Sequence, residues 1–209
     1  MTFHFDEIVD SEEGVREIIG NASDVVLRKQ IDYLDVHACA FISKSPFLLI
    51  SSTDSEGRMD ISPKGDPPGF VRVLDQHTLA IPDRPGNKRV DTFQNLVQTP
   101  QVGLLFLIPG KQETLRLSGH AQIVRDLWVR EPMALNGKVP DFAIVVTVKE
   151  VFFHCAKCVI RSKLWEPDFW PNLAGLPTLA QTMVDHGRLD KTVEQMQAII
   201  EGDAKNRLY

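Results

Sequence analysis

The stretch QVGLLFLIPGKQETLRLSGHAQIV, residues 101–124, indicates the fold class more clearly than any other part of the chain. Its first half is an almost unbroken apolar run, and Pro109 and Gly110 then begin a turn. Its second half alternates apolar and polar residues, which is typical of a strand with one buried face. The stretch therefore predicts two strands joined by a short turn.

Further strand patterns lie on both sides of this pair. They are FLLISSTD (47–54), RMDISPKGD (58–66), VRVLD (71–75), HTLAIPD (77–83) and the long run DFAIVVTVKEVFFHC (141–155). Gly57 lies at a tight turn between the first two, which predicts a hairpin. Parallel strands need long, usually helical, crossovers, and there is almost no room for them here. The sequence therefore predicts a mainly β fold, an antiparallel barrel or sandwich of six or seven strands within about 46–155.

Helical patterns flank these strands, and we expect one domain over residues 1–209. N-terminal helices are expected over about 10–44, and the C-terminal extension covers 156–209. Within the extension, 162–179 is rich in Pro and Trp and is expected to be irregular, whereas TVEQMQAIIEGD (192–203) predicts an amphipathic helix.

Composition and charge exclude several classes of function. The 209 residues carry a net charge of -5, which does not favour nucleic acid or an anionic membrane as a partner. Three cysteines are too few, and odd in number, for a secreted disulfide framework. No signal peptide and no membrane-spanning run are recognisable, so we expect a cytoplasmic protein.

The most informative segment for function is IPDRPGNKRVDTFQN, residues 81–95. It predicts a strand, a loop and a helix over 87–99 with Asn87 as its N-cap. Lys88 and Arg89 would then lie in the first helical turn, where the helix dipole disfavours cations, with Arg84 just before it. A bound phosphate would explain this arrangement. The alternative is a solvated basic turn neutralised by neighbouring aspartates.

A second polar segment, DISPKGD (60–66), ends one of the expected strands. Ser62 offers a hydroxyl group and Lys64 a cation. Alone, this pattern also fits a polar strand exit that binds nothing.

The order of these segments resembles the pyridoxamine phosphate oxidase-like family of FMN-binding split barrels, over roughly residues 25–165. In that family the equivalent strand, loop and helix hold the FMN phosphate, and two barrels pack with FMN between them. The resemblance implies a split β-barrel and a homodimer with FMN at its interface. The candidate FMN-binding residues are Ser62, Lys64, Arg84, Asn87, Lys88, Arg89, Asn95, Thr114, Arg116, Arg161, Ser162 and Trp165.

These candidates divide by the part of FMN they would contact. The segment 81–95 and Lys64 match the phosphate site, and Thr114 and Arg116 are expected near the flavin ring. The resemblance implies that the segment with Arg161, Ser162 and Trp165 also reaches the flavin, across the dimer if the partner supplies it. The alternative for Trp165 is an ordinary core or interface aromatic.

Two departures concern the substrate. The true oxidase has an arginine where this chain has Met59, and it has an Arg-Leu-x-Pro signature where this chain has Arg207-Leu208-Tyr209. These departures argue against pyridoxamine phosphate as the substrate, and the resemblance implies an FMN-dependent oxidoreductase acting on a small, unidentified substrate. Alternatives are a non-catalytic FMN-binding or storage module, and a split barrel that uses haem or a deazaflavin, for which His154 is the candidate axial ligand.

Other patterns assign no catalytic or metal-binding residue. Cys155 and Cys158 form a CxxC pair, but zinc binding requires a second pair of ligands, and none is placed nearby. We expect Cys155 to face the core at the end of a strand. No Ser-His-Asp or paired-carboxylate pattern stands out.

Overall fold

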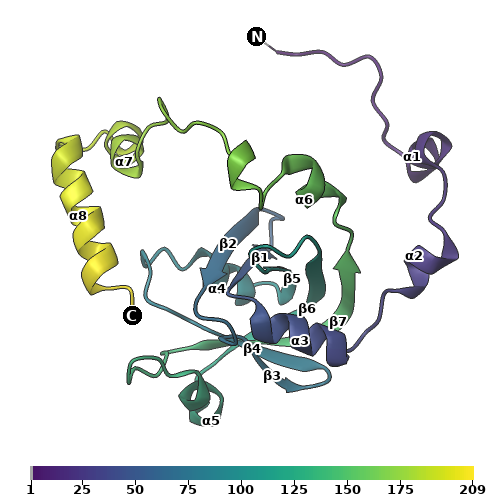
Figure 1. The fold of residues 1–209 in the computed structure, drawn as a ribbon, viewed down its shortest axis with the longest axis horizontal. Coiled ribbons are helices and arrows are strands. Elements are labelled where there is room, and N and C mark those ends of the chain that lie inside the picture. The colour runs from purple at the N-terminus through teal and green to yellow at the C-terminus, as the bar shows by residue number, and fades with distance from the viewer. Residues whose placement is uncertain (1) are drawn as a thin grey trace.

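The computed structural model describes residues 2–209 and contains one antiparallel sheet of seven strands (Figure 1). The strands are β1 (Phe47–Thr53), β2 (Met59–Gly65), β3 (Arg72–Asp75), β4 (Thr78–Pro82), β5 (Gln101–Leu107), β6 (Thr114–Val124) and β7 (Ala143–His154). Their order across the sheet is β2-β1-β5-β6-β7-β4-β3. The predicted mainly β, antiparallel fold is confirmed, and each expected strand run contains one of these strands.

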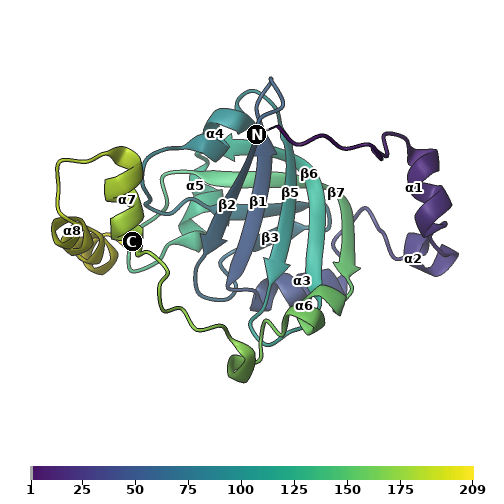
Figure 2. The same ribbon diagram turned by 90° about the horizontal axis from the view of Figure 1, so that it is seen from above.

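The sheet curls around its main apolar core and forms a split barrel, and a smaller apolar cluster lies between β4, β7 and α5 (Figure 2). The inward-facing side chains of β1, β5 and β6 are almost fully buried, for example Leu48, Phe106 and Leu117. Burial of each such side chain contributes about 1.5–3 kcal/mol. Helix α3 (Val36–Lys44) closes one end of the core with Phe41 and Ile42.

A bulge at Lys149 of β7, opposite Ser118 and Gly119 of β6, bends the long pair β6 and β7. The register between these strands shifts between Ser118 and Gly119. A side chain at Gly119 would overlap the carbonyl oxygen of Thr147 on β7, so only glycine fits at this close approach. The bend is one of the features that curve the sheet.

Helices precede and follow the barrel. They are α1 (Glu12–Ile19), α2 (Asp24–Arg28), α3, α4 (Asp91–Leu96), α5 (Leu127–Arg130), α6 (Lys157–Ser162), α7 (Leu179–Gly187) and α8 (Val193–Asn206), with 3-10 turns at Glu131–Met133 and Pro167–Phe169. The predicted N-terminal helices are present, and Ser11 caps α1 as expected. The predicted terminal helix is α8, which begins with a capping box at Thr192. The sequence did not predict α5, α6 or α7.

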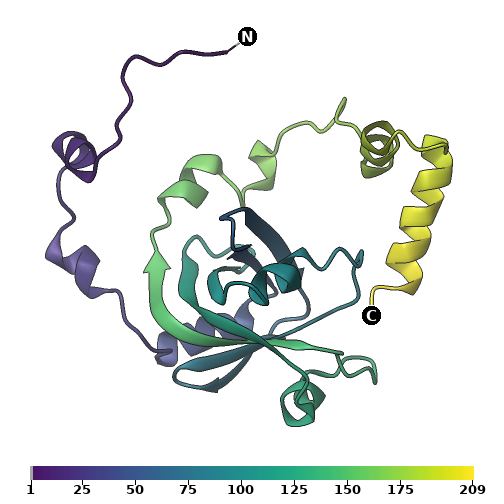
Figure 3. The ribbon, with the colours of Figure 1, turned by 180° about the vertical axis from the view of Figure 1, so that it is seen from behind.

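Both ends of the chain extend away from the barrel. The segments that carry α1 and α2 on one side, and α7 and α8 on the other, curve outward in Figures 1 and 3. No residue of α1 or α2 is buried. Among residues 2–209 there is no helix with the length and apolar character needed to cross a membrane.

The predicted helix over 87–99 is wrong at both ends, because α4 begins at Asp91 and ends at Leu96. The side chain of Asn87 accepts a hydrogen bond from the backbone N–H of Arg89 (3.0 Å) and forms a local turn. Such turns compete with helix formation. Lys88 and Val90 have φ of 61° and 56°, which a right-handed helix does not allow. Lys88 and Arg89 therefore lie in a loop before α4, and the predicted dipole conflict in a first helical turn does not occur.

Candidate functional site

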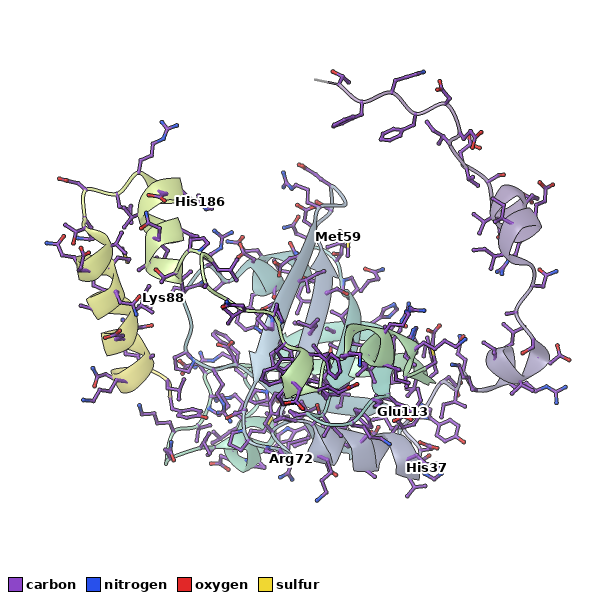
Figure 4. All side chains as sticks on the ribbon, turned by 45° about the horizontal axis from the view of Figure 1, so that its top comes forward. His37, Met59, Arg72, Lys88, Glu113 and His186 are labelled. Carbon is purple, nitrogen blue, oxygen red and sulfur yellow. The ribbon has the colours of Figure 1, made fainter. Side chains whose placement is uncertain are left out.

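A cavity of about 600 Å³ lies beside β2, between the loop that precedes α4 and the loop that precedes β7. Ser62 and Lys64 line it from β2, and Lys88 lines it from the loop 83–90. Lys138 and Tyr209 contribute from distant parts of the chain. Figure 4 shows Lys88 on the side of the barrel that faces α7 and α8. We call this space the β2 cavity.

Strand geometry decides which β2 side chains point toward the core side of the sheet. Side chains directly opposite each other in a sheet share a face, and Lys64 pairs with Leu48 while Ser62 pairs with Ile50. Because Leu48 and Ile50 are buried in the barrel, Ser62 and Lys64 point to the inner side of its edge. Successive side chains of a strand point to opposite faces, so Ile61, which precedes Ser62, points outward. Its side chain is 65% exposed.

Two hydrogen bonds fix α4 against the strands below it. Thr92 donates to a carboxylate oxygen of Asp60 on β2 (3.2 Å), and Asn95 donates to the hydroxyl oxygen of Ser52 on β1 (3.0 Å). Asn95 and Ser52 are both buried. These bonds hold the helix, and with it the end of the loop 83–90, at a set distance from β2.

Arg84 forms the most buried ion pair of the site. Its Nε lies 2.6 Å from Oδ2 of Asp66, and its Nη2 donates to the carbonyl oxygen of Met133 (2.9 Å). The Asp66 side chain is 1% exposed and also accepts from the hydroxyl group of Tyr209 (3.1 Å). The positive charge of Arg84 is therefore already balanced, and these contacts join four separate segments of the chain.

The remaining cations differ in how far they are paired. Arg89 makes a two-pronged contact with Asp91 (2.8 and 3.2 Å), and this contact raises the pKa of the guanidinium. Within residues 2–209, no carboxylate lies within ion-pair distance of Lys64 or Lys88. These two ammonium groups are the charges that an anion would meet first.

Asp83 places a carboxyl group in the same cavity. Burial raises the pKa of Asp83; Lys64 acts against this increase, and Asp141 adds to it. The raised pKa means that the environment disfavours the charged form of this group.

The structure brings together half of the predicted site residues. Those that line the β2 cavity are Ser62, Lys64, Arg84, Asn87, Lys88 and Arg89. Asn95 lies outside it, buried against β1. The predicted ring-contacting residues Thr114, Arg116, Arg161, Ser162 and Trp165 do not line it either.

These ring-side candidates lie in the barrel wall and just after it. Thr114 pairs with His154 across β6 and β7, and the guanidinium of Arg116 lies 5.3 Å from the ring centre of Phe152. The indole N–H of Trp165 donates to the carbonyl oxygen of Lys111 (2.8 Å). In one chain they therefore form a group separate from the β2 cavity.

Sequence reasoning missed Asp66, Asp83, Lys138 and Tyr209 as parts of the site. Tyr209 is 143 positions from Asp66, and Lys138 contacts the main-chain oxygen of Tyr209 (2.6 Å) across 71 positions. No local pattern predicts such contacts. Asp66 and Asp83 lay within the two polar segments, but nothing in the sequence distinguishes a buried ion pair from a solvated carboxylate.

The cysteines and histidines assemble no metal site among residues 2–209, where no group of three or more His, Cys, Asp or Glu side chains converges. His37 and His186, labelled in Figure 4, lie at opposite sides of the molecule. The expectation that Cys155 faces the core is wrong, because β7 ends at His154 and Cys155 is exposed in the turn that follows.

Comparison with known families identifies the family of the chain. The model of the family described as pyridoxamine 5'-phosphate oxidase matches residues 34–155, which include the barrel and the loop 83–90. The chain belongs to this family. The predicted resemblance is thus confirmed, and with it the split-barrel fold. No curated protein matches the sequence.

Solved structures with a similar fold include three bacterial proteins. A putative pyridoxamine 5'-phosphate oxidase from Lactobacillus delbrueckii is 17% identical, with a TM-score of 0.47, covering 58% of this chain and 95% of that one. HupZ from Group A Streptococcus is 17% identical, with a TM-score of 0.45, covering 55% and 88%. HutZ from Vibrio cholerae, described as a heme storage protein, is 18% identical, with a TM-score of 0.42, covering 58% and 93%.

Proposed function

We propose that this member of the family is an FMN-dependent oxidoreductase that acts on a small substrate as a cytoplasmic homodimer. The FMN phosphate would occupy the β2 cavity, and the flavin ring would lie toward a second chain. When bound, FMN accepts and releases electrons in pairs. The residues of this chain would hold and orient it.

The observation that carries this proposal is a pair of ammonium groups in the β2 cavity that have no carboxylate of residues 2–209 within ion-pair distance. Lys64 and Lys88 face the same cavity from a strand and a loop, and the hydroxyl group of Ser62 lies beside them. Cations that neutralise a phosphate through charge-assisted hydrogen bonds are what such a ligand requires. The volume of about 600 Å³ is also within the roughly 300–1,000 Å³ typical of small-molecule sites.

The outer face of β2, β1 and β5 offers an apolar surface to which a second chain would bind. Met59 and Ile61 are 67% and 65% exposed, and Phe47 is 37% exposed. Large exposed apolar side chains gathered on one face of a sheet are typical of an interaction site. A two-fold dimer is the commonest way to cover it.

The same face would bring the ring-side candidates to the flavin. Pro63, Leu49, Leu105 and Arg116 form one row across β2, β1, β5 and β6, and their side chains therefore point to the same outer face. Arg116 thus borders the proposed interface, although it does not line the β2 cavity of its own chain. A dimer would let one chain supply the phosphate site and the other supply Arg116.

The first test is the cofactor itself. The purified protein should be yellow, and heat should release FMN and not FAD, because the cavity offers uncompensated cations for one phosphate group. A colourless protein that gains no flavin absorbance when mixed with FMN would sink the proposal. A haem band in its place would favour the haem alternative, for which His154 is exposed at the end of β7.

Reduction by a nicotinamide donor separates an enzyme from a storage module. The bound flavin of an oxidoreductase should lose its visible absorbance when NADH, NADPH or a substrate is added without oxygen. A tightly bound flavin that none of these reduces would favour the non-catalytic alternative.

The dimer can be tested without flavin. Light scattering at micromolar concentration should give twice the chain mass for wild type and about one chain mass for Ile61→Lys, which places a charge on the outer face of β2. Ile199→Lys on α8, where the isoleucine is 50% exposed, is the matched control and should remain dimeric. A monomeric wild type that still binds flavin would refute the proposed interface.

A further inference from the structure

Two exposed thiols lie where β7 passes into α6. Cys155 follows the last residue of β7, and Cys158 is the second residue of α6. Both are free and exposed, whereas Cys39, the third cysteine, is partly buried against the core. Neither exposed thiol belongs to the β2 cavity or to the proposed flavin site.

The backbone brings the two cysteines within reach of each other. Ala156 has φ -70° and ψ -9°, and Lys157 is already helical, so residues 155–158 form a right-handed turn. The first and fourth Cα atoms of such a turn lie less than about 7 Å apart. Disulfides span Cα separations of about 4.4–6.8 Å, so a bridge requires only side-chain rotation and a small adjustment.

The turn is held firmly enough to keep this spacing. Val159, the next residue, is 6% exposed and packs into the protein, and the N–H of Ile160 donates to the carbonyl oxygen of Ala156 (2.9 Å). Unfolding of α6 is therefore not needed for the two thiols to meet.

The surroundings favour thiol chemistry over metal binding. A structural zinc site requires four ligands, and no third His, Cys, Asp or Glu joins this pair among residues 2–209. Lys157 and Arg161 lie on the same short helix, and Arg161 is one turn from Cys158. Their positive charge attracts small anionic disulfides.

We propose that Cys155 and Cys158 form a redox site that exchanges with low-molecular-weight disulfides such as glutathione disulfide. One cysteine thiolate attacks a sulfur of the small disulfide, forms a mixed disulfide and releases the first small thiol. The second cysteine then attacks the protein sulfur of the mixed disulfide and releases the second small thiol. The protein loses two protons and two electrons in forming the Cys155–Cys158 bond, and the small disulfide gains them as it becomes two thiols.

The test uses the full-length protein, equilibrated in buffers of defined ratio of reduced to oxidised glutathione and then quenched with acid. Wild type in the oxidising buffers should lose the mass of two hydrogen atoms, and a peptide map should show Cys155 linked to Cys158. After unfolding, only Cys39 should react with maleimide. The reducing buffers should restore three reactive thiols, the number in the sequence.

Single variants isolate the second step. Cys155→Ser and Cys158→Ser should each accumulate one glutathione adduct, because no second thiol is present to displace it. Cys39→Ala is the matched control and should form the intrachain bond as wild type does. Two glutathione adducts on wild type, a bond between two chains, or thiols that remain reduced in every buffer would each overturn the proposal.

Discussion

Replacing Lys64 with alanine tests the phosphate site most directly. Lys64 is half-buried at the end of β2, and no carboxylate of residues 2–209 lies within ion-pair distance of it, so binding an anion breaks no existing ion pair. A hydrogen bond to a charged group contributes about 1.5–3 kcal/mol. Since each 1.4 kcal/mol is a factor of ten, Lys64→Ala should raise the Kd for FMN about 10- to 150-fold.

Arg89→Ala provides a second point on the same scale. To bind the phosphate, the guanidinium of Arg89 must either contact Asp91 at the same time or give up this ion pair. An exposed ion pair of this kind contributes about 0–1 kcal/mol. The loss of FMN affinity should therefore be smaller than for Lys64→Ala. Because Arg89 precedes α4 and does not lie in its first turn, we expect no gain in apo-protein stability from relief of dipole repulsion.

The assay is calorimetric or fluorescence titration of FMN and of riboflavin into each apo-protein, with thermal melts of the same samples. Riboflavin lacks the phosphate, so wild type, Lys64→Ala and Arg89→Ala should bind it equally. Lys44→Ala, an exposed lysine on α3 outside the cavity, is the matched control. Equal weakening of riboflavin and FMN would show that Lys64 contacts the ring or supports the fold; no weakening of FMN would place the phosphate elsewhere.

Three further predictions concern the groups around the cavity. Asp66→Asn leaves Arg84 without its buried partner and should lower the free energy of unfolding by about 3–5 kcal/mol in denaturant titrations. A loss below about 1 kcal/mol would mean that solvent already screens the ion pair. Asn95→Ala leaves the buried hydroxyl group of Ser52 without its donor and should lower the free energy of unfolding by about 1–3 kcal/mol. The Kd for FMN should stay unchanged. Unchanged stability together with weaker FMN binding would show that Asn95 is a cofactor ligand. The raised pKa of Asp83 means that its ionisation destabilises the folded chain as the pH rises from near the ordinary aspartate value of 3.8. The Tm of Asp83→Asn should therefore equal that of wild type near pH 3, exceed it as the pH rises through the raised pKa, and keep a constant excess above it. A difference that does not depend on pH would contradict the assigned cause.

Local sequence patterns were sufficient to predict the strands, because a strand or turn pattern depends only on residues that are neighbours in the sequence. Alternation of apolar and polar residues over 114–124 and the turn at Gly57 depend only on neighbouring residues, and the structure has a strand or a turn at each. The start of α4 was missed because the backbone before it leaves the right-handed helical region. The N–H of Arg89 donates to Asn87 as it would to an N-cap, but Lys88 and Val90 have positive φ, which a right-handed helix does not allow.

The sequence by itself determined the strands, the family and the two segments that line the β2 cavity, since each follows from local periodicity or a continuous motif. Only the tertiary structure decided that Asp66 neutralises Arg84, that Tyr209 joins them from a distant position, and that no carboxylate of residues 2–209 lies within ion-pair distance of Lys64. Charge on a side chain is visible in the sequence, but its compensation depends on partners that folding brings together from distant positions. The exposure of Cys155 follows the same logic, because whether a residue after a strand is buried depends on where that strand ends in the barrel.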